Sequence, residues 1–127
     1  MKSIIPISIL IFLFSVSCIA QEKKNENEMK TYTFVMLKRG ENISQDAREK
    51  ATIQKKHMEY IGYMADSGHL NVAGPFMDDG FWRGILIFNS TDTVKIRQMV
   101  EKDPAVMAGR LTFEMHPWLT QRGTTFK

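Results

Sequence analysis

The sequence predicts a single α+β domain in which two helices cover one antiparallel sheet. Three observations predict this fold class. The chain has 127 residues, 43% hydrophobic and 24% charged, a composition typical of one globular domain. Segments rich in β-branched and aromatic residues alternate with segments whose apolar residues recur at helical spacing. Their order, strand, helix, strand, strand, helix, strand, is the split βαβ or ferredoxin-like arrangement, βαββαβ.

The first half of the domain is expected to contain one strand and one long amphipathic helix. Residues 31–37 (TYTFVML) predict the strand, which ends at residues 38–40 (KRG). Asn42 and Ser44 are candidate N-caps of the helix, and Gly68 is expected to end it. The apolar stripe of this helix is formed by Ile53, His57, Tyr60, Ile61 and Met64.

The second half is expected to contain three strands and the second helix. Residues 70–73 and 81–88 predict two strands joined through an acidic turn, and residues 111–115 predict the last strand. One of residues 90–92 caps the helix, which ends before Pro104 because proline cannot continue the helical hydrogen bonds. The inner stripe of this helix consists of Ile96, Met99, Val100 and Asp103.

Both faces of the predicted sheet are apolar, although the helices can cover only one of them. Within the two longest apolar strands, Tyr32, Phe34 and Met36 alternate with Val35 and Leu37, and Trp82, Leu86 and Phe88 alternate with Phe81, Ile85 and Ile87. Burial of each large side chain stabilises by about 1.5 to 3 kcal/mol, so an uncovered apolar face is costly. We therefore expect a homodimer in which the sheets of two copies pack together.

Residues 1–20 have the layout of a secretory signal peptide. Lys2 supplies a positive charge, and residues 4–16 form an uncharged, mostly apolar run that is too short for a permanent membrane span. Two processing routes remain open: cleavage after Ala20, or lipid attachment at Cys18, which would be the only contact with a membrane. Either route predicts an exported protein, periplasmic or lipid-anchored at the cell envelope of a bacterium.

Composition divides the rest of the chain into a polar linker (21–29), the folded domain (30–120) and a short tail (121–127). The 17 basic and 14 acidic residues give a net charge of +3 and are interspersed, so the basic patch of a nucleic-acid-binding protein is missing. The single cysteine excludes an internal disulfide and a multi-cysteine zinc site.

Two polar residues occupy positions where the helical pattern calls for apolar ones. His57 lies on the stripe of the first helix, where a buried imidazole needs a hydrogen-bond partner. Asp103 is expected at the C-terminal end of the second helix, where the helix dipole disfavours a carboxylate. Because both helices cover the same sheet face, we predict that the two side chains meet as a catalytic acid–base pair. Two alternatives stay open: His57 bonded to a backbone carbonyl, and Asp103 bonded to the local N–H groups of an Asp-Pro turn.

Phe34, Tyr60 and Trp82 are candidates for an aromatic substrate pocket that would suit a flat or cyclic small molecule. The alternative is that they belong to the ordinary core. His69 and His116 lack the short spacing of a helical metal pair, so no metal site is predicted. The sequence has no nucleophile elbow and no glycine-rich phosphate loop, which disfavours covalent catalysis.

Taken together, residues across the domain resemble the YCII-related domain family. The pattern consists of His57, Tyr60, Gly68, Leu70, Gly74-Pro75, Gly84 to Phe88, Asp103-Pro104, Gly109, Glu114 and Pro117-Trp118. The resemblance implies a dimeric α+β barrel of ferredoxin-like subunits, an active-site pair at His57 and Asp103, and no cofactor. Some members are linked to dehydrochlorination or lactone chemistry on ring metabolites. The export signal, and Ala105 where the family often has phenylalanine, are departures, so the substrate class is not carried over.

Three classes of function follow from these observations. The first is a cofactor-independent isomerase or lyase in which His57 moves protons and Asp103 orients it. The second is a module that binds a small, unidentified ligand with the same pair but without chemistry. The third is a structural dimerisation domain of an exported protein.

Overall fold

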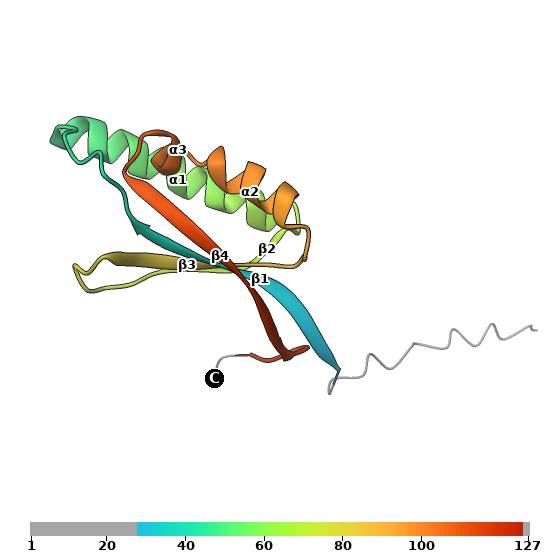
Figure 1. Cartoon of the computed structure of the whole chain (residues 1–127). Helices are drawn as coiled ribbons and strands as arrows, with labels where there is room; N and C mark the ends of the chain where they lie inside the picture. Colours follow the sequence, from blue (N-terminus) through green and yellow to red (C-terminus); the bar gives the residue numbers. More distant parts are fainter. Residues whose placement is uncertain (1–27, 126–127) are drawn as a thin grey trace, which may run out of the picture.

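The computed structural model describes residues 28–125 of the chain. Its elements are β1 (Met29–Arg39), α1 (Ala47–Asp66), β2 (Leu70–Pro75), β3 (Trp82–Phe88), α2 (Thr93–Glu101), α3 (Pro104–Met107) and β4 (Leu111–Gln121). The strands form one sheet in the order β2-β3-β1-β4, with every neighbouring pair antiparallel. Figure 1 shows the helices on one face of this sheet. The predicted α+β, ferredoxin-like fold is confirmed, with α3 as an additional short helix.

The structure differs from the sequence-based prediction near both ends of the folded domain. The signal peptide (1–20), Cys18 and most of the polar linker lie outside the described residues. The last linker residue was assigned wrongly, because Met29 is the first residue of β1. Likewise β4 continues to Gln121 instead of ending at residue 115. Strands β1 and β4 pair in continuous register over their whole length. The backbone of each strand therefore provides hydrogen-bond partners for the added residues of the other strand.

The first helix begins later than the sequence predicted. Its N-cap is Asp46, whose carboxylate accepts a hydrogen bond from the N–H of Glu49 at 2.8 Å. Asn42, one of the predicted caps, instead donates its side-chain amide to the carbonyl of Ala108 at 3.0 Å. Ser44, the other, donates its hydroxyl to the Asn42 side chain. The loop before α1 is therefore attached to the loop before β4.

The core lies between the helices and the sheet. Its buried cluster consists of Val35, Leu37, Met64, Leu70, Leu86, Phe88, Ile96 and Val100. The register pairs Val35 with both Leu86 and Met115, so the three side chains share the helix-facing side of the sheet. Asp92 caps α2 through a hydrogen bond from the N–H of Lys95, within the range that the sequence predicted.

The opposite face of the sheet is not covered by any described helix. Phe34 and Tyr32 lie on this face, because they alternate with the buried Val35 along β1. Trp118 of β4 contacts both of them, with ring centroids 6.4 Å from Phe34 and 6.3 Å from Tyr32. In the single chain Tyr32 is buried, so the aromatic surface of this face is formed by the partly exposed Phe34 and by Trp118, which is 39% exposed.

Candidate active site

Asp103 caps the short helix α3 and does not end α2. The second helix stops at Glu101, and Asp103 precedes Pro104, the first residue of α3. The Oδ1 atom of Asp103 accepts a hydrogen bond from the N–H of Ala105 at 2.8 Å, and the residue is completely buried. The predicted location at a helix C-terminus was wrong. A helix N-terminus presents unpaired N–H groups, so the local field favours this carboxylate.

His57 reaches this carboxylate from α1. Its Nδ1 atom lies 2.7 Å from Oδ2 and 2.9 Å from Oδ1 of Asp103, and 11% of the imidazole side chain is exposed. The partner of Nδ1 is thus a carboxylate, not a backbone carbonyl. Asp103 also makes the local hydrogen bond expected of an Asp-Pro turn, so it uses both of the interactions weighed from the sequence. The fold brings together two side chains separated by 46 positions in the chain.

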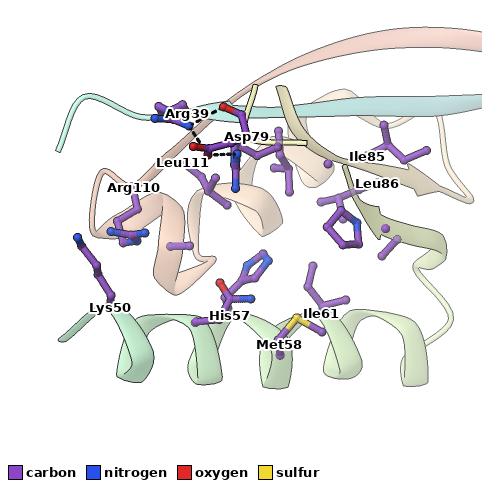
Figure 2. A pocket seen from close by; sticks show the side chains of 18 of the residues that line it. Arg39, Lys50, His57, Met58, Ile61, Asp79, Ile85, Leu86, Arg110 and Leu111 are labelled. Atoms are coloured by element: carbon purple, nitrogen blue, oxygen red, sulfur yellow. Dashed lines mark hydrogen bonds and ion pairs between the residues drawn. The ribbon is translucent and has the colours of Figure 1, made fainter. Parts of the chain in front are cut away.

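The hydrogen bonds around Asp103 define the tautomer of a neutral His57. An ionised carboxylate only accepts hydrogen bonds, so Nδ1 of the imidazole donates the proton. The lone pair then lies on Nε2, which has no hydrogen-bond partner among residues 28–125. Figure 2 shows the ring projecting from α1 into the space between the helix and the sheet. The site can therefore present a basic nitrogen to a bound molecule while Asp103 stabilises the imidazolium.

The space in front of His57 is a cavity of about 530 Å³ between α1 and the sheet. Such a volume falls in the range of about 300 to 1,000 Å³ that small-molecule sites occupy. The helix contributes one stripe of side chains at helical spacing: Lys50, Gln54, His57, Met58 and Ile61. The apolar part of the opposite wall comes from Leu37, Ala73, Pro75, Ile85, Leu86, Ala105 and Leu111.

The three aromatic residues proposed for the pocket do not line this cavity. Phe34 lies on the uncovered face of the sheet, against Trp118. Tyr60 points toward α2, where its hydroxyl donates to the carbonyl of Met99 at 2.9 Å. Trp82, at the start of β3, is 57% exposed. The sequence showed that these residues are aromatic, but which face each one occupies is decided by strand register and helix rotation.

Tyr60 is nevertheless coupled electrostatically to the His–Asp pair. Burial raises the pKa of its phenol, and the negative charge of Asp103 and the neighbouring Tyr63 raise it further. The phenol therefore stays protonated and keeps its hydrogen bond to Met99. Tyr60 thus joins α1 to α2 three residues after His57, and so supports the position of the imidazole.

Several charged residues that were not predicted from the sequence line the cavity. Arg39, Lys50, Arg83 and Arg110 contribute positive charges, and Asp79 contributes a negative one. Asp79 pairs with Arg39 at 2.8 Å and with Arg83 at 3.3 Å. One signal was present in the sequence, because Lys50, Gln54 and His57 share a helix face at intervals of four and three residues. The arginines come from other elements, and no local pattern associates them with His57.

The remaining histidines stand apart from the site. His116 lies 3.6 Å from the carboxylate of Glu114 on β4, and His69 precedes β2. Among residues 28–125, no three His, Cys, Asp or Glu side chains gather in a way that could hold a metal ion. No helix in the same part of the chain is both long enough and apolar enough to cross a membrane.

Fold and site together define an α+β protein of ferredoxin-like topology with a His–Asp pair whose imidazole lines a cavity of small-molecule size. The model of the YCII-related domain matches residues 31–118. The chain belongs to this family, as the sequence pattern predicted.

Among solved structures, the chain is similar to 5-chloro-2-hydroxyhydroquinone dehydrochlorinase (TftG) from Burkholderia phenoliruptrix AC1100, in complex with 2,5-dihydroxybenzoquinone. The TM-score is 0.52 and the sequence identity 18%, over 68% of this chain and 92% of the other. At this identity the likeness concerns the fold. The comparison with curated proteins found no match.

Proposed function

We propose that this protein is a cofactor-independent enzyme that moves protons on a small organic substrate, an isomerase or lyase. The observation that carries the proposal is the buried Asp103 carboxylate 2.7 Å from Nδ1 of His57, on a ring that projects into the cavity. A carboxylate behind an imidazole fixes the tautomer and stabilises the protonated ring, which is the arrangement that general acid–base catalysis requires.

In the proposed reaction, Nε2 of His57 accepts a proton from an acidic C–H or O–H bond of the substrate. The bonding electron pair stays on the substrate, and Asp103 stabilises the imidazolium that results. In an isomerisation, the imidazolium returns the same proton to a different atom of the substrate. In an elimination, the electron pair forms a new double bond, the leaving group departs with its own bonding pair, and the proton passes from His57 to solvent.

The name of the structural neighbour supports the elimination variant and a cyclic substrate. TftG is a dehydrochlorinase, and its structure holds a cyclic quinone. Loss of HCl from a ring needs one basic group and a departing chloride, and the pair described above supplies the basic group. Chlorinated hydroquinones and lactones are therefore the first substrates to test.

The experiment compares turnover of these substrates by wild type, His57→Asn and His57→Ala. Both variants are expected to lose about 10²- to 10⁴-fold in kcat, the range of one acid–base group, while substrate binding persists. The matched control is His69→Asn, which changes a histidine outside the cavity and should leave kcat unaltered. Turnover that survives in both His57 variants would exclude this mechanism.

A ligand-binding module without chemistry is the second candidate, because the same cavity would serve recognition equally well. It predicts no turnover with any of these substrates, and loss of affinity when His57 is replaced. A ligand that co-purifies in the cavity and leaves unchanged would favour this function over catalysis.

We also propose that the working form is a homodimer whose two sheets pack face to face. The aromatic surface around Phe34 and Trp118 supports it, since the helices occupy the other side of the sheet. Sedimentation at micromolar concentration should give twice the mass of the mature chain for wild type. Trp118→Glu should shift the protein toward monomer. A wild-type protein that sediments as a monomer would rule the dimer out.

Export remains a proposal that rests on residues 1–20 of the sequence. The mass of the intact protein, recovered from a bacterium that expresses the full chain, distinguishes the two processing routes. Cleavage after Ala20 leaves a chain that begins at Gln21, whereas lipidation leaves Cys18 with an added acyl mass. A full-length mass in the cytoplasm would contradict both routes.

A further inference from the structure

The lining of the cavity carries more positive charge than the protein itself neutralises. Arg39 lies at the end of β1, Lys50 near the start of α1, Arg83 in β3, and Arg110 just before β4. The single acidic residue in the lining, Asp79, is shared between Arg39 and Arg83. Arg110 and Lys50 are therefore left without a carboxylate partner among residues 28–125.

Arg110 is held in place by neutral groups. Its Nη1 atom donates to Oε1 of Gln45 at 3.1 Å, and the other end of that amide donates to the carbonyl of Ala108 at 3.2 Å. Gln45 is buried, with 6% of its surface exposed, so the amide is a fixed support. A neutral partner orients the guanidinium but does not neutralise its charge, and the planar donor face that remains suits a carboxylate.

The backbone around Arg110 is fixed as well. Its N–H donates to the carbonyl of Ala105, and its carbonyl accepts from the N–H of Gly40 at 2.8 Å. A Cβ atom on Gly40 would lie 2.1 Å from the carbonyl oxygen of Gly109, so only glycine permits this contact. A cation on a rigid backbone binds an anion at a lower entropic cost than one on a mobile loop.

The spacing along α1 relates these cations to His57. Lys50, Gln54 and His57 lie on the same helix face and line the same cavity. Seven residues at 1.5 Å each separate Lys50 from His57 by about 10 Å along the axis, and the lysine side chain can span part of that length. Figure 2 shows Lys50 and Arg110 on the same side of His57, with the apolar Ile61 on the other side of the imidazole.

We propose that the cavity binds an organic acid whose carboxylate lies between Lys50 and Arg110. The hydrocarbon part of the molecule then extends over the apolar wall, and its reacting atom lies at Nε2 of His57. Gln45 is a positioning residue that orients Arg110 toward the carboxylate. This inference rests on the proposed function for the location of the chemistry, whereas the anion site itself stands on the lining of the cavity.

The test measures binding of matched pairs of probes to the full-length protein by calorimetry in low salt. The pairs are benzoate with benzamide, and cyclohexanecarboxylate with cyclohexanecarboxamide. Wild type should bind the carboxylate of each pair at least about tenfold more tightly, because a charge-assisted pair is stronger than a neutral hydrogen bond. Arg110→Gln and Lys50→Gln should each reduce that preference about fivefold or more and leave amide binding unchanged.

Charge-matched control variants on the outer side of the same helix are Arg48→Gln and Lys55→Gln, which are exposed and do not line the cavity. Both should bind the probes as wild type does. Equal binding of carboxylate and amide by wild type, or equal weakening of both by Arg110→Gln, would overturn the proposal. Inorganic phosphate that competes with benzoate more strongly than acetate does would also overturn it, in favour of a phosphate site.

The anion site and the acid–base mechanism are separated by His57→Asn. This variant should retain the carboxylate preference even though turnover is lost. If the preference for carboxylate probes is retained but the wild type shows no turnover, the proposed enzymatic function is refuted and the anion site stands. Turnover that depends on His57 but shows no carboxylate preference would refute the anion site alone.

Discussion

Oδ2 of Asp103 lies 2.7 Å from Nδ1 of His57, while Oδ1 of the same carboxylate holds the N–H of Ala105. One buried group thus begins helix α3 and orients the imidazole of α1. The same carboxylate therefore has a structural role and, in the proposed mechanism, a chemical one, and substitutions of Asp103 should separate the two.

Asp103→Asn should keep the helix cap and damage the chemistry. The asparagine carbonyl can still accept from Ala105, but its NH₂ group favours the imidazole tautomer with an unprotonated Nδ1. We expect a loss of at least about 100-fold in kcat, with KM much less affected. Steady-state kinetics with a chlorinated hydroquinone or lactone that the wild type turns over would measure the loss in kcat. The ¹⁵N chemical shifts of the imidazole would report the tautomer. Activity within threefold of wild type would show that tautomer control is not needed.

Asp103→Ala should destabilise the fold as well. It removes the N-cap of α3 and the partner of a nearly buried imidazole, which together should lower the free energy of unfolding by about 1 to 3 kcal/mol. Asp92→Ala removes the cap of α2 far from the cavity lining, and should cost about 1 kcal/mol without affecting turnover. Urea unfolding of both variants measures the difference. Equal kinetic defects in the two would contradict the assignment of Asp103 to the site.

Tyr60→Phe tests the hydrogen bond from α1 to α2. Loss of the hydroxyl that donates to Met99 should lower the free energy of unfolding by about 0.5 to 1.5 kcal/mol at pH 8. Tyr63→Phe is the matched control, because Tyr63 is exposed and its neighbour Tyr60 makes the helix contact. It should change stability by less than about 0.5 kcal/mol.

The pH dependence of Tyr60→Phe has a definite sign. The pKa of Tyr60 in the folded state is raised above its ordinary value of 10.0, so the folded protein holds the phenolic proton more tightly than the unfolded chain. The contribution of the protonated phenol to the free energy of unfolding is complete below pH 10 and is lost as the pH rises through the raised pKa. The stability difference between wild type and Tyr60→Phe should therefore shrink above pH 10, as urea unfolding at pH 8 and pH 10.5 would show. A difference that grows at high pH would contradict this account.

Gly40→Ala tests the contact that fixes Arg110. The new methyl group would collide with the carbonyl of Gly109, so we expect a loss of about 1 to 3 kcal/mol and a weaker preference for carboxylate probes. Gly62→Ala is the control, since nothing lies within 4 Å of its Cβ position on α1. That substitution should stabilise by up to about 1 kcal/mol, because alanine has the higher helix propensity. Thermal unfolding and benzoate binding of the two variants provide the comparison.

Much of the fold could be predicted because its signals are local. The alternation of apolar residues in 31–37 and the helical stripe through Ile53, His57 and Ile61 depend only on near neighbours in the chain. Boundaries were less accurate where pairing decides them. β4 extends to Gln121 because β1 lies beside it, and Pro117 is tolerated there because β4 is an edge strand.

The candidate site divides in the same way. By itself the sequence determined that His57 and Asp103 are polar residues in apolar surroundings, and that two helices would cover one sheet face. Only the tertiary structure decided that Asp103 caps α3, that Tyr60 points to α2, and that Arg110 and Lys50 line the cavity with His57. The physical reason is that residue spacing records periodicity within one element, whereas helix rotation, strand register and loop docking result from packing between elements.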